Sequence, residues 1–254
     1  MAPSLQDAQI SFVGGGNMAS AIIGGLLAKD ISKQHIYVAE PWDVNRDKMA
    51  AIGVRTTASN VDASRDADIV IIAVKPQVAK VACTELGAAW ADRKELPLVI
   101  SIAAGITVAS YGASGLYANE GVSTEEKDLA TALLASVSRA AEWVDKESLL
   151  DVVTGISGSG PAYFFAFVEH LITAGTSLGL SEEQATRLAK QTALGAGKML
   201  VEATEDPAQL RKNVTSPNGT THAALVSFEN DGLKEIVGRA VKAATDRAEE
   251  LGKA

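Results

Sequence analysis

In the first part of the chain, short apolar runs typical of β-strands alternate with segments whose apolar residues recur with the period of an α-helix. Four apolar runs have the length and composition of β-strands, at residues 9–13, 35–39, 68–74 and 98–103. Helical periodicity predicts helices between them, at residues 18–27, 45–51 and 78–90. The third run is apolar almost without interruption, which is typical of a strand buried on both faces of a parallel sheet. This alternation predicts an α/β fold with a Rossmann-type, doubly wound parallel sheet.

The second part of the chain has helical periodicity almost throughout. Ser123 with Glu126, and Ser181 with Gln184, have the spacing of a capping box, so a helix is predicted to begin after each serine. From Pro161 onward the predicted helices cover residues 163–178, 181–203, 225–228 and 233–251. Small side chains on the second of these would let a partner helix approach closely: Ala185, Ala189, Ala193, Ala196 and Gly197. We therefore expect a dinucleotide-binding domain at 1–145 and an all-helical substrate and dimerisation domain at 146–254.

Composition narrows the class of protein. The chain has 254 residues, 47% of them hydrophobic, and a net charge of −8, which indicates a globular protein and argues against a nucleic-acid surface. The single cysteine, Cys83, excludes an intrachain disulfide and a zinc cluster, and we expect it to be a buried, inert thiol; no metal site is predicted. No apolar run has the length of a membrane span and no leader peptide is evident, so we expect no membrane partner and a cytoplasmic location.

A glycine turn follows the first predicted strand and opens the first predicted helix. Its pattern is Gly14-x-Gly16-x-x-Ala19, in the context that gives this motif its meaning. The first glycine permits the tight turn, the second lets a pyrophosphate approach the backbone, and the alanine keeps the helix close to the strand. The turn predicts a dinucleotide site.

The residues after the second strand leave the choice of dinucleotide open. Glu40 stands where an acid often accepts a hydrogen bond from the ribose 2′-hydroxyl, which favours NAD. Pro41 and Trp42 could instead form a wall beside the adenine, and Arg46 is near enough to meet a 2′-phosphate. Both NADH and NADPH therefore remain candidate cofactors.

A second polar loop, Ser216-Pro217-Asn218-Gly219-Thr220-Thr221, precedes another helical run. The free N–H groups at a helix N-terminus form an anion site, and hydroxyls in place of a lysine favour a small carboxylate over a polyphosphate. The N–H groups of Gly219, Thr220 and Thr221 suit that carboxylate, although a well-capped turn alone has the same composition. His222 beside the loop is either a proton donor or a surface residue. A nucleotide site together with a carboxylate site indicates a redox enzyme for a small acid.

Five motifs, in order along the chain, resemble those of pyrroline-5-carboxylate reductases. They are Gly14-Gly15-Gly16-Asn17-Met18-Ala19, Ala73-Val74-Lys75-Pro76-Gln77, Ser101-Ile102-Ala103-Ala104-Gly105-Ile106, Ser157-Gly158-Ser159-Gly160-Pro161-Ala162-Tyr163 and Val214-Thr215-Ser216-Pro217-Asn218-Gly219-Thr220-Thr221. The resemblance extends from about residue 10 to 251. It implies NAD(P)H-dependent reduction of 1-pyrroline-5-carboxylate to L-proline, the last step of proline biosynthesis, by a homodimer whose helical domains interdigitate. In this family, dimers commonly assemble into a larger ring.

The resemblance also implies roles for individual residues. It assigns the contact with the imine nitrogen to the Thr221 hydroxyl. The expected substrate-binding residues are Glu147, Ser216, Gly219, Thr220 and Thr221. The expected cofactor-binding residues are Gly14, Gly15, Gly16, Asn17, Met18, Ala39, Glu40, Pro41, Asn60, Val74, Lys75, Pro76, Ala103, Ala104 and Asn213. Lys75 also follows a buried strand at its carboxyl end, where ligands bind in such sheets.

The chain departs from the family between Ser110 and Tyr111. The family has a helix and a strand there, and the strand ends in a Met-Pro-Asn-Thr-Pro motif that normally borders the nicotinamide. Either the protein carries a true deletion, or the 254-residue sequence lacks a segment that the natural protein has; the family-like residues up to the junction favour the second explanation. Two other functions stay open: a reductase of this architecture for another small imine or 2-oxo acid, and a non-catalytic dinucleotide-binding or dimerising protein.

Overall fold

Five parallel strands form the central sheet. The computed structural model describes residues 3–102 and 112–253. The strands are β1 (Ile10–Val13), β2 (Ile36–Ala39), β3 (Arg55–Thr57), β4 (Ile69–Ile72) and β5 (Leu98–Ser101), in the order β3-β2-β1-β4-β5. The chain thus builds outward from β1 in one direction and then in the other, which places the topological switch point between β1 and β4. The predicted doubly wound sheet is confirmed.

Apolar side chains on both faces hold the sheet in place. Ile10 and Phe12 of β1 belong to a large apolar cluster on one face, whereas Val13 belongs to a smaller cluster on the other. The helices of this part are α1 (Asn17–Leu27), α2 (Asp43–Ile52), α3 (Asn60–Ser64) and α4 (Pro76–Ala89). Helix α1 contributes Ile22, Ile23 and Leu26 to the large cluster, and α4 contributes Ala82 and Leu86 to the smaller one. Burial on both faces explains the nearly continuous apolar run of β4.

A second sheet, of two parallel strands, follows the central sheet along the chain. It pairs β6 (Gly112–Leu116) with β7 (Ser138–Trp143), and α5 (Thr124–Leu134) connects the two strands. Both parts of the predicted capping box are present at α5: the Ser123 hydroxyl accepts from the Glu126 N–H, and the Glu126 carboxylate accepts from the Ser123 N–H. Leu129 and Leu133 of α5 join the large apolar cluster. The chain continues with α6 (Leu149–Val153) and a π-helical turn (Thr154–Gly158).

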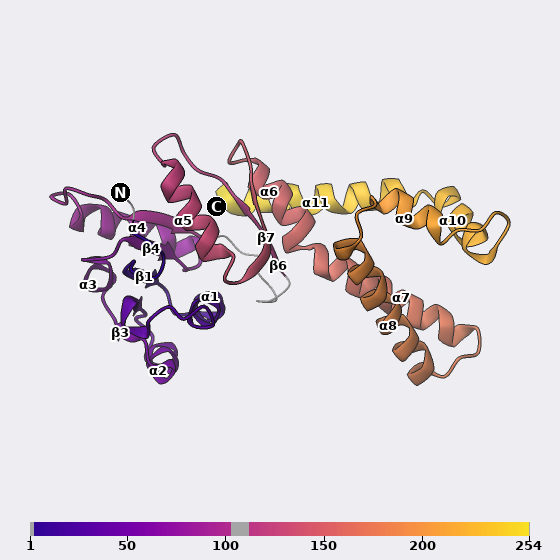
Figure 1. Cartoon of the computed structure of the whole chain (residues 1–254), viewed down its shortest axis with the longest axis horizontal. Coiled ribbons are helices and arrows are strands. Elements are labelled where there is room, and N and C mark those ends of the chain that lie inside the picture. The colour runs from indigo at the N-terminus through magenta and orange to yellow at the C-terminus, as the bar shows by residue number, and fades with distance from the viewer. Residues whose placement is uncertain (1–2, 103–111, 254) are drawn as a thin grey trace. The chain divides into compact units, whose positions relative to one another are not determined.

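Contacts divide the chain into two compact units, one of residues 1–158 with 245–254 and one of residues 159–244. The second unit contains α7 (Gly160–Ser177), α8 (Glu182–Glu202), α9 (Pro207–Asn213), α10 (Thr220–Asn230) and most of α11 (Leu233–Lys253). Helices α7 and α8 pack side by side (Figure 1). Ala185 and Ala189 are buried, and Gly175 lies next to the Ala185 methyl group. The predicted domain boundary after residue 145 remains a prediction.

Large apolar side chains of the second unit are exposed in the single chain. Phe164, Phe165, Leu178 and Val201 each expose more than two thirds of their surface. Within the described residues, no helix is long and apolar enough to cross a membrane. Large apolar side chains exposed in such number on one unit are typical of a face that another protein surface covers.

One side chain differs from the prediction. Cys83 is exposed, because α4 buries only the face with Ala82 and Leu86 and Cys83 lies outside that face. The expectation of a buried thiol was wrong.

Candidate functional site

The glycine turn at the end of β1 has a geometry that only glycine fits well. Gly14 has a φ of +103°, in the left-handed region, and its N–H donates to the Ala39 carbonyl at 2.8 Å. A Cβ at Gly14 would lie 2.6 Å from the Ala73 carbonyl oxygen. The turn therefore passes directly over the ends of β2 and β4, at the switch point of the sheet.

The first turn of α1 offers free backbone donors at this point. Gly16 is the N-cap and provides no side-chain cap, and the first hydrogen bond of the helix is from the Ser20 N–H to the Gly16 carbonyl, at 3.0 Å. The N–H groups of Asn17, Met18 and Ala19 precede that bond and have no acceptor within the helix. A Cβ at Gly16 would meet no atom within 4 Å, so the space in front of these donors is open. The turn fits the pyrophosphate of a dinucleotide.

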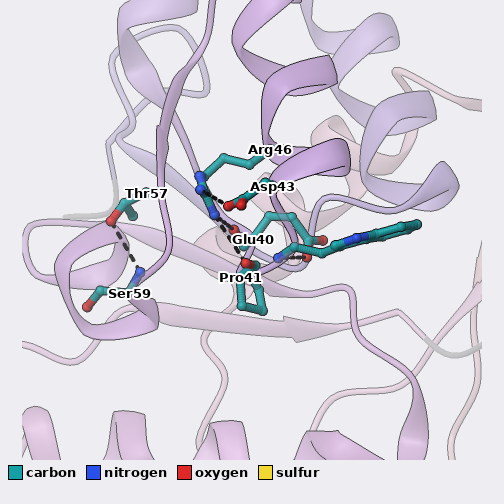
Figure 2. A network of polar contacts seen from close by, with 7 residues as sticks. Glu40, Pro41, Asp43, Arg46, Thr57 and Ser59 are labelled. Atoms are coloured by element: carbon teal, nitrogen blue, oxygen red, sulfur yellow. Dashed lines mark hydrogen bonds and ion pairs between the residues drawn. The ribbon is translucent and has the colours of Figure 1, made fainter.

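Glu40 lies beside the turn at the end of β2 and is only 8% exposed. Its Oε2 accepts from the Gly15 N–H at 2.8 Å, and its Oε1 accepts from the Trp42 N–H at 3.0 Å. Figure 2 shows this residue with Pro41, Asp43 and Arg46. Arg46 donates to the carbonyls of Glu40 and Pro41 and forms an ion pair with Asp43. The residue predicted to contact the ribose, Glu40, is thus a buried carboxylate with a fixed orientation.

The other predicted cofactor residues of the first unit lie at the same edge of the sheet. Ala39 ends β2 and is buried, Val74 follows β4 and packs against the smaller apolar cluster, and Lys75 is the exposed N-cap of α4, before Pro76. Asn60 begins α3 and donates from its amide to Glu85 at 2.9 Å. Ala103 and Ala104 lie outside the described residues.

The carboxylate loop belongs to the second unit. The Gly219 N–H donates to the Ser216 carbonyl at 3.0 Å, and Asn218 has a φ of +58°. Proline and then asparagine at the two central positions, with a positive φ at the second, are typical of a type II turn. The turn ends at Gly219, the N-cap of α10, so Thr220 and Thr221 occupy the first helical positions.

This geometry changes one expectation about the donors. The Gly219 N–H is used within the turn and is not available to a carboxylate. Since the first α-helical bond runs from Ala223 to Gly219, the N–H groups of Thr220, Thr221 and His222 lack an acceptor within the helix. Thr221 is half-buried, whereas Ser216, Thr220 and the imidazole of His222 are exposed.

Two predicted residues stand apart from these groups. Glu147 is exposed before α6 and lines a cavity of about 400 Å³ in the first unit. Asn213 ends α9 in the second unit, is exposed, and accepts from Gln209 at 2.7 Å. The nucleotide turn and Glu147 therefore belong to one unit, and the carboxylate loop and Asn213 to the other.

The structure adds two hydroxyl residues that the sequence pattern did not point to. Thr57 ends β3, where its carbonyl accepts from the Glu40 N–H at 2.9 Å, and its hydroxyl accepts from the Ser59 N–H at 3.2 Å (Figure 2). Strand β3 has only three residues, an arginine and two threonines, so it is too short and too polar to stand out by periodicity. Ser59 itself is the N-cap of α3, which is the signal that could have located this strand end.

Comparisons with known families agree with the two-part organisation. The family model described as pyrroline-5-carboxylate reductase dimerisation matches residues 147–251. The family model described as NADP oxidoreductase, coenzyme F420-dependent, matches residues 9–105.

Similar proteins cover the whole chain. The pyrroline-5-carboxylate reductase of Pseudomonas aeruginosa is 42% identical over 267 aligned residues, which cover 96% of each chain. The solved structure of a pyrroline-5-carboxylate reductase from Coxiella burnetii is 36% identical, covers 97% of this chain and 99% of its own, and superposes with a TM-score of 0.88. The Plasmodium falciparum pyrroline carboxylate reductase, solved with NADP bound, is 26% identical, with coverages of 97% and 99% and a TM-score of 0.74. The chain belongs to the pyrroline-5-carboxylate reductase family.

Proposed function

We propose that this chain reduces 1-pyrroline-5-carboxylate to L-proline with NADPH or NADH, as the last step of proline biosynthesis, through the residues described above. The observation that supports it most is the presence, in one chain of this family, of two helix N-termini whose first N–H groups have no acceptor within the helix, at α1 and at α10. The first suits a pyrophosphate and the second a small carboxylate. A cyclic imino acid and a dinucleotide need both kinds of anion site.

The first unit would hold the cofactor at the carboxyl edge of its sheet. The N–H groups of residues 17–19 face the pyrophosphate, Glu40 faces the adenosine ribose, and Lys75 at the start of α4 provides a positive charge at the next strand end. When bound, the nicotinamide supplies the hydride. The protein's own part is to position that group and to fix the charges around it.

The second unit would hold the substrate. The N–H groups of Thr220 and Thr221 donate to the carboxylate of the imino acid, supported by the dipole of α10. In the protonated imine, hydride addition to the ring carbon would move the electrons of the C=N double bond onto the ring nitrogen, which already carries its proton, so the secondary amine forms without a further proton. The Thr221 hydroxyl, in the first turn of α10, would donate a hydrogen bond to that nitrogen as its electron density rises. Ser216 belongs to the same loop, and Glu147, in the first unit, remains a substrate-binding residue that only the family resemblance predicts.

The helical unit supports a homodimer. The dimerisation model matches it, and its exposed phenylalanines and leucines supply apolar surface for a second copy. Assembly of dimers into a larger ring and a cytoplasmic location remain predictions from the sequence.

The departure from the family between Ser110 and Tyr111 lies outside the described residues, but the sheet edges on either side of it are described. Strand β5 pairs with β4, and β6 pairs with β7; neither pairs with the other. A cavity of about 400 Å³ separates them, lined by β5 and by residues 113–117. The alignment with the P. aeruginosa relative runs over 267 positions, yet 96% of 254 residues is about 244, so about 23 positions of that relative have no counterpart in this chain. In a relative that has the additional helix and strand between Ser110 and Tyr111, we expect that strand to fill the gap between β5 and β6.

An intact mass of the protein from its natural source separates the two explanations of this departure. A mass near 26.3 kDa identifies a true deletion, whereas a mass about 23 residues larger means that the natural protein contains a segment that the 254-residue sequence lacks.

The glycine turn gives a first test. Gly16→Val should weaken NADH binding at least tenfold, about 1.4 kcal/mol, because its side chain occupies the space needed by the pyrophosphate. Since a Cβ at Gly16 meets no atom of the protein, the melting temperature should hardly change. The control is Gly24→Val on the same helix, where a Cβ also meets nothing. Unchanged NADH affinity in folded Gly16→Val, measured by titration calorimetry, contradicts the assignment.

Thr221→Val tests the catalytic hydroxyl. The variant keeps the shape of the side chain and removes one donor at the reacting nitrogen, a loss of about 1–3 kcal/mol, so kcat/KM should fall roughly tenfold to a hundredfold. NADH affinity should stay constant, and Thr221→Ser should restore most of the activity. Thr173→Val on α7 controls for the substitution itself. A lowered melting temperature with unchanged kcat/KM per folded molecule would leave Thr221 a purely structural residue.

The gap between β5 and β6 predicts the effect of insertion. The unmatched residues of the P. aeruginosa relative, inserted between Ser110 and Tyr111, should cover the open edge of β5 and raise the melting temperature by several degrees, since about 1 kcal/mol shifts it by about 2–4 °C. A glycine-serine insert of equal length is the control. If both inserts give the same melting temperature, the gap is not a strand position.

A further inference from the structure

We propose that this chain binds NADH in preference to NADPH, and that Glu40, assisted by Asp43, is the residue that discriminates. The inference rests on the proposed function, because it takes the glycine turn as the dinucleotide site. It goes beyond that function, which leaves both cofactors open, and it departs from the matched relatives that are described with NADP.

The position of the Glu40 carboxylate is set by two backbone donors. Its two oxygens accept from the N–H groups of Gly15 and Trp42, at 2.8 and 3.0 Å, so the side chain bridges the glycine turn and the loop after β2. Both oxygens therefore act as hydrogen-bond acceptors, which fixes the orientation of the carboxyl group. Rotating it away would leave the buried Gly15 N–H without its acceptor, which costs more than an exposed side-chain movement.

This carboxylate lies where the adenosine ribose is expected. An acid at the end of the second strand accepts from the ribose hydroxyls of NADH through the lone pairs that the protein does not use. A 2′-phosphate at the same position brings negative charge against a carboxylate that is 8% exposed, with little water to screen it. The fixed position therefore favours a hydroxyl over a phosphate.

Arg46 is the cation of this loop and helix that the sequence pointed to for offsetting that repulsion, and three of its five N–H groups are already used. One guanidinium nitrogen donates to the carbonyls of Glu40 and Pro41, at 2.9 and 3.2 Å, and the other forms an ion pair with Asp43 (Figure 2). Asp43 itself is exposed at the first position of α2 and adds a second negative charge to the region. Moving the guanidinium toward a phosphate would compete with the contacts to the Glu40 and Pro41 carbonyls, which hold the loop after β2.

Strand β3, next to β2, provides no positive charge at its carboxyl end that could bind a 2′-phosphate. Thr57 and Ser59, at the carboxyl end of β3, bring neutral hydroxyl groups. The cation of β3 is Arg55, which begins the strand and therefore lies at its opposite end, with its guanidinium 4.1 Å from the centre of the Tyr37 ring. In a parallel strand of this length the two ends belong to opposite edges of the sheet.

Binding measurements test this without any turnover. The dissociation constants of NADH and NADPH are measured by titration calorimetry for the full chain and for E40Q, D43N and D47N. E40Q keeps the size of the side chain and an acceptor for the Gly15 N–H while removing the charge. D47N removes an equal charge from the exposed side of α2 one turn further along, and is the matched control.

The unaltered chain should bind NADH at least tenfold more tightly than NADPH. E40Q should reduce this ratio at least fivefold, mainly by tightening NADPH binding, and D43N should reduce it by a smaller factor because it releases Arg46. D47N should leave the ratio unchanged. Equal or tighter binding of NADPH by the unaltered chain overturns the inference, as does an equal change in D47N and E40Q. Failure to bind either dinucleotide would instead overturn the proposed cofactor site.

Discussion

The tight passage of the chain over the end of the sheet at Gly14 is the constraint on which the nucleotide half of the molecule depends. At this point the backbone is in the left-handed region and the Cα is so close to the Ala73 carbonyl that no side chain fits. Because the turn is this short, α1 begins directly above the switch point between β1 and β4, with its first N–H groups at the carboxyl edge of the sheet. The residue after Gly14, Gly15, donates its backbone N–H to the Glu40 carboxylate, so the same turn also positions the acid at the end of β2.

Packing beneath the turn explains how this geometry is maintained. Ala19 and Ile22 of α1 are fully buried in the apolar cluster that also contains Phe12 of β1, and a small side chain at residue 19 allows close packing of helix and strand. The strands themselves are apolar on both faces, so the sheet cannot shift its register without exposing one of the two clusters. The helical unit uses a different principle. Its small residues pack α7 against α8, and its large apolar residues remain exposed for a second copy.

The periodicity of apolar residues predicted the helices and strands that are long or strongly apolar. The short strands of small or polar residues have no such signal in the sequence. Strand β4, helix α1 and the capped helices α5 and α8 follow from local signals, and all are present. Strands β6 and β7 were not predicted, because Gly112–Leu116 and Ser138–Trp143 are rich in glycine, alanine and serine and acquire their strand conformation from pairing with each other. The tertiary surroundings likewise decided details of the site. The chain pattern located the turn before α10, but only the structure shows that Gly219 uses its N–H within that turn.

The site residues were predicted as a set along the sequence, and the structure groups them by unit. The glycine turn, Glu40 and Lys75 meet at one edge of the sheet because the carboxyl ends of parallel strands share that edge. The network around Arg46 could not be predicted in the same way, since it depends on which carbonyls the loop after β2 turns toward the guanidinium.

A crystal structure of the chain with bound NADH would test the central claim most directly. The structure predicts pyrophosphate oxygens within hydrogen-bond distance of the N–H groups at the start of α1, and adenosine ribose hydroxyls on the Glu40 carboxylate. A dinucleotide bound elsewhere, or bound with its ribose turned away from Glu40, would contradict it.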